Sequence, residues 1–161
     1  MGEDKAGLVY GGQTLLDHAR ALLEAAGCSS IYVSGRPDEP DGLEDTNPGG
    51  GPAHAIIDML DRFRSQAEGI LVIPVDMPKL TIDHLVPLLA APRPVARIWD
   101  GYPLPAWFSC GLAPPDREDI WSIKRLLASV EAESLTLPAG LMEGLENVNT
   151  PEAFARLTSS R

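Results

Sequence analysis

The sequence predicts an α/β fold in which helices flank a mainly parallel sheet, and two repeats of helix followed by strand are the main evidence. Residues 14–26 carry apolar side chains at helical spacing, and a short strand is expected at 30–34. Residues 54–67 repeat the amphipathic pattern, and the apolar run 70–75 follows it. Strands that alternate with helical segments in this way are typical of parallel sheets.

The first helix has clear start and stop signals. Thr14 and Asp17 form a capping pair at its beginning, and Gly27 marks its end. After the strand that ends at Ser34, a loop rich in Gly, Pro and Asp runs to about Pro52. Loops of this length in a compact domain are usually functional or disordered, so this segment is a candidate for ligand binding.

The second half of the chain continues the pattern. A helix is expected over 82–89, beginning at Thr81. Two strands, near 95–99 and 106–110, are separated by Asp100-Gly101, which favours a hairpin or an irregular β extension. The remaining expected elements are a helix at 116–130, a strand at 134–137 and a final helix that opens at Thr150-Pro151-Glu152.

Length and composition are those of a single soluble globular domain covering residues 1–161. The chain is 44% hydrophobic and 22% charged, and it has no apolar run of the roughly 18 residues that a membrane span requires. Its acidic start at Glu3 and Asp4 lacks the zones of a secretory signal, so we expect a cytoplasmic protein without a membrane partner.

The net charge narrows the class of partner. A formal charge of −10 argues against nucleic acid, because proteins that bind it present a basic face. A small anionic ligand stays compatible with this charge if local groups offset it. Cys28 and Cys110 are isolated in sequence and form no zinc-binding spacing, so we expect buried, reduced thiols.

Asp76 is the first candidate for chemistry. It ends an apolar run, Gly69 to Val75, that is typical of a strand buried on both faces, and ligands of open α/β sheets bind at the carboxyl ends of such strands. Its hard carboxylate oxygens suit Mg²⁺. The alternative is ordinary turn chemistry, because Asp followed closely by Pro78 also reverses a chain.

Three further segments are candidates, and each has a structural alternative. Lys5 carries a compact charge that could neutralise phosphate, or it could be solvated near the terminus. The glycines of 44–52 let a backbone approach a ligand, or they form a linker. Residues 147–151 present amide oxygens that could complete a metal shell or hold a base, or they form the turn before a capped helix.

Taken in order, the motifs resemble those of the molybdenum cofactor guanylyltransferase family, the molybdopterin-guanine dinucleotide biosynthesis protein A. The resemblance covers residues 1–157 in colinear order, and the Asp-Met-Pro and Asn-x-Asn-Thr-Pro pieces together are its most specific part. The matching motifs are Met-Gly-x-Asp-Lys-Ala, Gly-Gly-Gln-Thr-Leu-Leu-Asp-His, Val-Ser-Gly-Arg, Glu-Asp…Gly-Gly-Gly-Pro, Ile-Pro-Val-Asp-Met-Pro-Lys-Leu, Pro-Leu-Pro-Ala and Asn-Val-Asn-Thr-Pro-Glu.

The resemblance implies a Rossmann-like nucleotidyltransferase that moves GMP from Mg²⁺-bound GTP to the terminal phosphate of molybdenum-bound molybdopterin and releases pyrophosphate. Asp76 would bind Mg²⁺ and Lys5 would contact the nucleotide phosphates. Such chemistry needs positioning and charge neutralisation rather than a protein nucleophile. GTP, molybdopterin and a protein that delivers or accepts the pterin are the partners that the resemblance implies.

The same resemblance assigns the remaining site residues. Asp45 would hold the nucleotide together with the loop at Gly51 and Pro52, and Ser34 would lie in the base or ribose pocket where Asn is common. The cofactor-substrate side would be formed by Pro103, Leu104, Asn147 and Asn149, of which Asn149 could also assist the metal.

One departure from the family pattern concerns the N-terminus. The family begins with an apolar strand and a Leu-Ala-Gly-Gly-x-Ser-x-Arg loop just ahead of the Met-Gly that here is Met1-Gly2. We therefore expect a fold without its usual first strand and without the loop that would cradle the triphosphate, and a neighbouring strand with an unpaired edge. Either the chain begins late within a longer protein, or it is a short form that has lost catalysis.

Two alternative functions stay open. A cytidylyltransferase or another nucleotidyltransferase of the same architecture would use the same groups, because base choice depends on a few pocket residues. A non-catalytic protein that binds nucleotide or cofactor would keep this fold without the phosphate loop.

Overall fold

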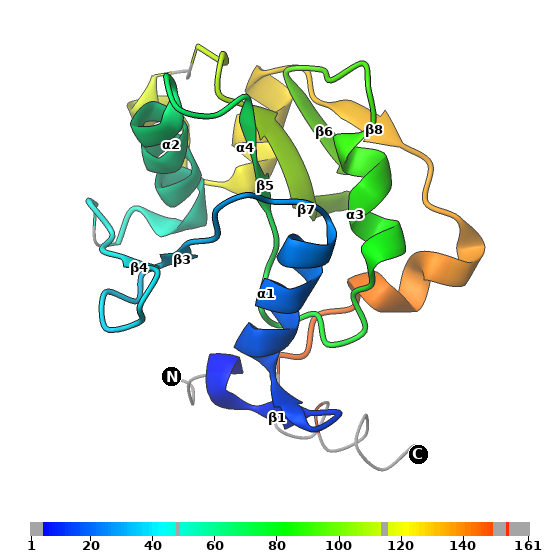
Figure 1. Ribbon diagram of the computed structural model, residues 1–161. Helices are drawn as coiled ribbons and strands as arrows, with labels where there is room; N and C mark the ends of the chain where they lie inside the picture. The colour runs from blue at the N-terminus through cyan, green and yellow to red at the C-terminus, as the bar shows by residue number, and fades with distance from the viewer. Residues whose placement is uncertain (1–4, 48, 114–115, 150–153, 155–161) are drawn as a thin grey trace.

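A four-stranded sheet with the order β5-β7-β6-β8 lies at the centre of the computed structural model, which describes residues 5–47, 49–113, 116–149 and 154 (Figure 1). The strands are β5 (Gly69–Val72), β6 (Ala96–Trp99), β7 (Tyr102–Ser109) and β8 (Glu133–Leu135). β7 is antiparallel to both β5 and β6, whereas β6 and β8 are parallel. The α/β prediction is thus confirmed, but the sheet is mixed rather than mainly parallel.

The hairpin between β6 and β7 explains the difference. Asp100 and Gly101 reverse the chain, and Gly101 has a φ of 81°, a left-handed conformation that glycine adopts without strain. β7 therefore enters the sheet in the opposite direction and lies between β5 and β6. Of the two alternatives that the sequence left open for 95–110, the hairpin is confirmed.

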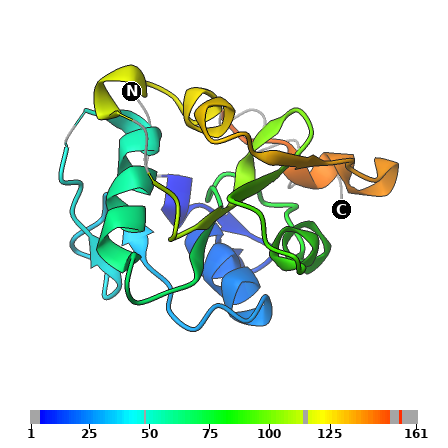
Figure 2. The same cartoon turned by 90° about the horizontal axis from the view of Figure 1, so that it is seen from above.

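Helices cover both faces of the sheet, as Figure 2 shows from above. α2 (Gly51–Phe63) and α4 (Ile123–Ser129) pack on one face, where Phe108 and the buried side chains of both helices form one core cluster. α3 (Ile82–Leu89) packs on the other face against Trp99 and Trp107, and the end of α1 (Leu15–Ala25) adds Leu22 to this second cluster.

The helices with local end signals lie where they were predicted. Thr14 caps α1 by accepting a hydrogen bond from the backbone nitrogen of Asp17 at 3.0 Å, and Gly27 follows its end with a φ of 87°. α3 has the predicted bounds, with Thr81 and His84 forming a capping box. Both predictions are confirmed.

The other two helices have different bounds from those predicted. α2 begins at Gly51 rather than His54, because Pro52 fits the first turn of a helix, and it ends at Phe63. α4 is shorter than the predicted helix over 116–130, because Ser122 caps it and a separate 3₁₀ turn, η2 (Arg117–Asp119), precedes it.

β5 also differs from its prediction. It ends at Val72, three residues before the predicted end, and Pro74 has no backbone N–H to continue the ladder. All four of its residues are half-buried rather than buried on both faces. The reason is that β5 is an edge strand of the described sheet, with β7 as its neighbour.

Short elements complete the described chain. β3 (Val33–Ser34) pairs in parallel with β4 (Gly42–Leu43), which lies in the long loop. β3 is shorter than the strand expected at 30–34. The remaining short elements are η1 (Lys5–Gly7), the hairpin of β1 (Val9–Tyr10) and β2 (Gln13–Thr14), and η3 (Ala139–Leu145). The predicted final helix at Thr150-Pro151-Glu152 lies outside the described residues.

The described part of the chain bears on the expected lack of a membrane span and on the state of the two cysteines. Among its helices, none is long and apolar enough to cross a membrane. Cys28 and Cys110 are both free; Cys110 is buried and Cys28 is half-buried. Burial raises the pKa of each thiol, which disfavours a reactive thiolate.

An ion-pair group joins η2 to α2 and makes stability depend on pH. Hydrogen bonds from Arg64 and then from Arg117, each with an N···O distance of 2.8 Å, lower the pKa of Asp61. Because this pKa is lower in the folded state, the pairs stabilise the fold above the ordinary carboxyl pKa of about 4. We expect that contribution to disappear as the pH falls through the lowered pKa of Asp61.

Replacing Arg64 by glutamine tests this expectation. The pKa of Asp61, followed by NMR titration of its carboxyl carbon, should rise toward the ordinary value, because the largest cause of the shift has been removed. The exposed Arg62→Gln variant, two residues before Arg64 in the last turn of α2, should leave the Asp61 pKa in place. An Asp61 pKa that does not move in Arg64→Gln would contradict the assignment.

Candidate functional site

A small apolar cluster brings together three segments that are far apart in sequence. Three of its four members are each next to a residue that the sequence singled out, namely Lys5, Ser34 and Asp76. These three side chains therefore start from one region of the molecule, beside the carboxyl end of β5. The cluster consists of the buried Ala6, Leu16 and Val33, with Val75 packed against them.

Lys5, Asp76 and Asn149 are in direct contact. The Lys5 ammonium lies 3.3 Å from the Asp76 carboxylate (Oδ2) and donates a hydrogen bond of 2.7 Å to the amide oxygen (Oδ1) of Asn149. The Asp76 side chain is 19% exposed and that of Lys5 35% exposed, so both are accessible to a small ligand. The structure thus brings three predicted site residues, Lys5, Asp76 and Asn149, into one group, which we call the Lys5 group.

A backbone contact fixes this arrangement. The backbone N–H of Val148 donates to the carbonyl oxygen of Asp76 at 2.8 Å, which holds the segment with Asn147 and Asn149 against the end of β5. Asn147 itself is exposed. The role of Val148 was not predicted, because a backbone hydrogen bond across 72 residues leaves no side-chain pattern in a single sequence.

Ser34 and Asp45 form a second pair. The Ser34 hydroxyl donates to Asp45 Oδ1 at 3.1 Å. Gly35, with a φ of 73°, lies so close that a Cβ at this position would be 3.3 Å from the Asp45 carboxylate. The pairing of β3 with β4 brings these residues together, since Ser34 is opposite Leu43 in the register.

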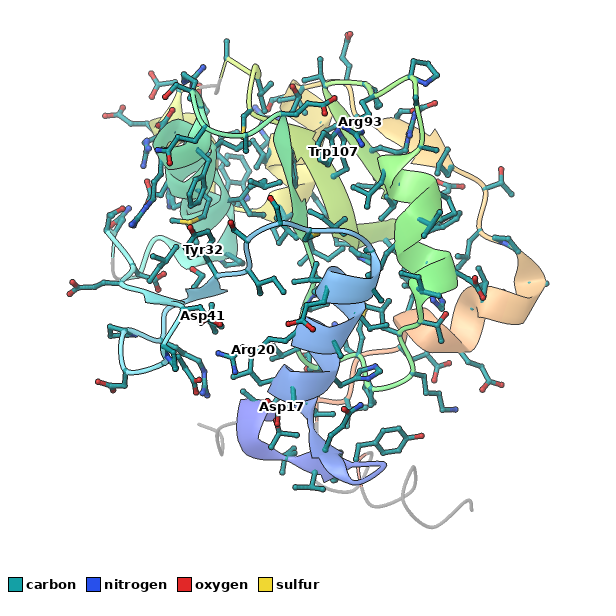
Figure 3. The ribbon with its side chains drawn as sticks, viewed as in Figure 1. Asp17, Arg20, Tyr32, Asp41, Arg93 and Trp107 are labelled. Atoms are coloured by element: carbon teal, nitrogen blue, oxygen red, sulfur yellow. The ribbon has the colours of Figure 1, made fainter. Side chains whose placement is uncertain are left out.

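The loop that leads to Asp45 is attached to α1 by Arg20, whose side chain points toward Asp41 in Figure 3. Its guanidinium pairs with Asp41 and with Glu39, each at 3.1 Å. Gly42 is required here, because a Cβ would lie 1.7 Å from the carbonyl oxygen of Arg36. The segment before Asp45 is therefore ordered rather than a free linker.

The other predicted residues lie elsewhere on the sheet and on α2. Gly51 and Pro52 are exposed in the first turn of α2, where Gly51 has a φ of 74°. Pro103 and Leu104 follow Tyr102 at the start of β7, at the edge where β5 and β6 end, but Leu104 packs partly into the core between α2 and the sheet. Among the described residues, no hydrogen bond or ion pair joins Ser34–Asp45 to the Lys5 group.

The donor atoms of the Lys5 group fit one kind of metal site. Within the described ranges there is no group of three or more His, Cys, Asp or Glu side chains that could hold a metal ion alone. Asp76 and Asn149 supply two hard oxygens through a carboxylate and an amide. Mg²⁺ is usually held by one or two carboxylates together with substrate phosphates, so these residues fit a metal that arrives with a nucleotide.

The fold and this site define a class of protein. An α/β sheet with a carboxylate, an amide and a lysine at the carboxyl end of a strand has the groups that phosphoryl and nucleotidyl transfer need, which are a metal ligand and a cation for phosphate. The site contains no Ser, Cys or His arranged as an activated nucleophile among the described contacts with Asp76.

Comparison with known proteins identifies the family. The sequence model of the MobA-like NTP transferase domain matches residues 1–134. A protein named molybdenum cofactor guanylyltransferase, from Xanthomonas euvesicatoria pv. vesicatoria (strain 85-10), is 30% identical over 165 residues, which cover 98% of this chain and 87% of that protein. The chain belongs to the MobA-like NTP transferase family, and this relationship confirms the predicted class of nucleotidyltransferase.

Proposed function

We propose that this chain is a one-domain, Rossmann-like nucleotidyltransferase that transfers GMP from Mg²⁺-bound GTP to molybdenum-bound molybdopterin. A terminal phosphate oxygen of the pterin would bond to the α-phosphorus of GTP, and the bond from that phosphorus to the departing pyrophosphate would break. The observation that carries the proposal is the contact of Lys5, Asp76 and Asn149 at the end of β5. The name of the Xanthomonas relative supports the choice of substrates.

Each residue has a proposed role that follows from its chemistry. Asp76 and Asn149 would hold Mg²⁺, which supplies charge neutralisation to the phosphates. Lys5 would bind phosphate oxygens with its ammonium group. Ser34 and Asp45 would bind the base or ribose, next to the loop at Gly51 and Pro52.

The acceptor would bind on the remaining side of the site. Pro103, Leu104 and Asn147 would contact the pterin, because they lie at the same edge of the sheet as Asp76 or in the segment hydrogen-bonded to it. Of these, Asn147 is the exposed contact, whereas Pro103 and Leu104 are half-buried and Leu104 also packs against the core.

Release of pyrophosphate tests the proposal. With Mg²⁺ and molybdenum-bound molybdopterin present, the chain should release pyrophosphate from GTP faster than from CTP. The same assay on the chain preceded by the family's Leu-Ala-Gly-Gly-x-Ser-x-Arg segment measures what that loop contributes. Preference for CTP would indicate a cytidylyltransferase, and no release by either form would favour a binding protein.

Asp45→Asn should weaken nucleotide binding specifically. We expect the KM for GTP to rise about tenfold with a smaller change in kcat, because a charged hydrogen bond is worth about 1.5–3 kcal/mol in both the bound and transition states. Glu44→Gln, at the neighbouring exposed acid, is the matched control and should leave the KM within about twofold. Equal KM values for the two variants would exclude Asp45 from the nucleotide site.

A further inference from the structure

The Lys5 ammonium lies where a metal ion would have its ligands. It contacts Asp76 Oδ2 at 3.3 Å and Asn149 Oδ1 at 2.7 Å, so a positive charge already lies between the two oxygens proposed as metal donors. Lys5 belongs to a short 3₁₀ turn, and buried Ala6 anchors this turn in the apolar cluster beside Val75. The ammonium is therefore held near these oxygens by the fold and is not a freely solvated terminal charge.

We propose that, before nucleotide binds, Lys5 acts as a tethered counter-ion that competes with the divalent cation for Asp76 and Asn149. The proposal deepens the proposed function and rests on its assignment of Asp76 as metal ligand. It adds that metal binding and movement of Lys5 are one coupled event. After Lys5 has left Asp76 and Asn149, its ammonium would bind the phosphate oxygens of the incoming nucleotide.

The coupling follows from distances and charge. Mg²⁺ binds its oxygen ligands at about 2.0–2.1 Å, so an ion on Asp76 and Asn149 would occupy the space near the Lys5 nitrogen. Two like charges so close repel strongly in a partly buried site, and Lys5 must withdraw. The apparent metal affinity is then reduced by the stability of the Lys5 contacts, and any ligand that binds the ammonium elsewhere increases it.

This coupling would make the metal arrive with its substrate. Metal alone must displace Lys5 without compensation, whereas metal bound to a nucleoside triphosphate brings the phosphate oxygens that accept the ammonium. The site would thus favour the complex of metal and nucleotide over either component. It would do so with a side chain that the reaction itself needs for phosphate binding.

A titration with Mn²⁺ in the absence of nucleotide, followed by electron paramagnetic resonance, tests the proposal on the full chain. Lys5→Met should bind Mn²⁺ at least about fivefold more tightly than the wild type, the lower end of typical coupling between sites. Lys124→Met is the matched control, because it removes the same charge from an exposed position on α4. It should bind Mn²⁺ as the wild type does, and Asp76→Asn should lose the site.

The outcomes separate this proposal from the proposed function. If Lys5→Met binds no more tightly than Lys124→Met while Asp76→Asn loses binding, the counter-ion role is wrong and the metal site stands. If Asp76→Asn binds Mn²⁺ as the wild type does, both the metal site and the proposal are wrong. If Lys5→Met gains affinity but GTP gives no pyrophosphate, the coupling stands and the proposed reaction fails.

A measurement on the wild-type chain covers the case in which Lys5→Met does not fold. The three lysines, Lys5, Lys79 and Lys124, can be observed separately by NMR after ¹³C-dimethylation of their amines. A Mg²⁺ concentration that displaces Mn²⁺ should shift the Lys5 signal and leave that of Lys124 in place. An unchanged Lys5 signal under this condition overturns the proposal.

Discussion

Asp76→Asn is expected to lower the rate of nucleotidyl transfer by at least about a hundredfold. The substitution keeps the size of the side chain and removes the carboxylate that would hold Mg²⁺, so charge neutralisation on the departing pyrophosphate is lost. A hundredfold corresponds to about 2.7 kcal/mol of transition-state stabilisation, well within what metal catalysis supplies. Pyrophosphate release from GTP at saturating substrate measures the effect.

A matched control separates this effect from a general loss of charge. Glu24→Gln makes the same carboxylate-to-amide change on the exposed face of α1 and should keep the wild-type rate. Asp76→Asn should also keep the wild-type circular dichroism spectrum, because the Val148 hydrogen bond uses the backbone of Asp76 and not its side chain. Activity within a few fold of the wild type would remove Asp76 from the mechanism.

Arg97→Met is expected to lower the free energy of unfolding by about 3–5 kcal/mol, the usual cost of breaking a buried charged network. Arg97 is 5% exposed on β6. Its Nε donates to Glu133 at 2.5 Å, and its terminal nitrogens donate to backbone carbonyl groups at and after the end of α3. These carbonyl groups belong to Pro87, Leu88, Ala90 and Pro92.

The expected loss of stability is large because the backbone carbonyl groups that accept hydrogen bonds from Arg97 would lose their donor. Carbonyl groups at the end of a helix have no partner within the helix, and an orphaned buried acceptor costs about 1–3 kcal/mol. Chemical denaturation measures the loss. Arg62→Met, at an exposed position on α2, should cost less than about 0.5 kcal/mol, and an equal cost for both variants would exclude the network as the cause.

Elements defined by local chemistry were predicted correctly from the sequence. α1 and α3 carry their own caps at Thr14 and Thr81, so their bounds follow from short-range interactions. The Asp100-Gly101 turn likewise marks the hairpin before any tertiary contact is known. The mixed order of the sheet was not predicted, because a strand carries no local mark of which neighbours it will pair with.

The burial of individual side chains also depends on tertiary contacts that a single sequence does not reveal. The alternation of Val95, Arg97 and Trp99 predicted a strand, yet it gave no sign that Arg97 would be buried against the end of α3. Trp99 and Trp107 are buried, whereas Trp121 is 71% exposed, although all three are large apolar side chains. The type of a side chain, apolar or charged, does not by itself indicate whether a neighbouring helix or strand will bury it.

The candidate site shows the same limit. Asp76 could be identified from the strand that precedes it, but its contact with Lys5 spans 71 residues of chain, and the contact of Lys5 with Asn149 spans 144. Only the family resemblance linked these residues before the structure did. The structure shows that they meet, and the pairing of Ser34 with Asp45 depends likewise on the β3 and β4 register.

The position of β5 in the sheet has a consequence for how this protein loses activity. Opening β7 breaks two rows of backbone hydrogen bonds, whereas opening β5 breaks the single row that joins it to β7 in the described sheet. Local openings of edge elements require less free energy than global unfolding. Asp76 lies four residues beyond β5, so mild heat or denaturant would displace the carboxylate that we propose as the Mg²⁺ ligand while most of the fold persists.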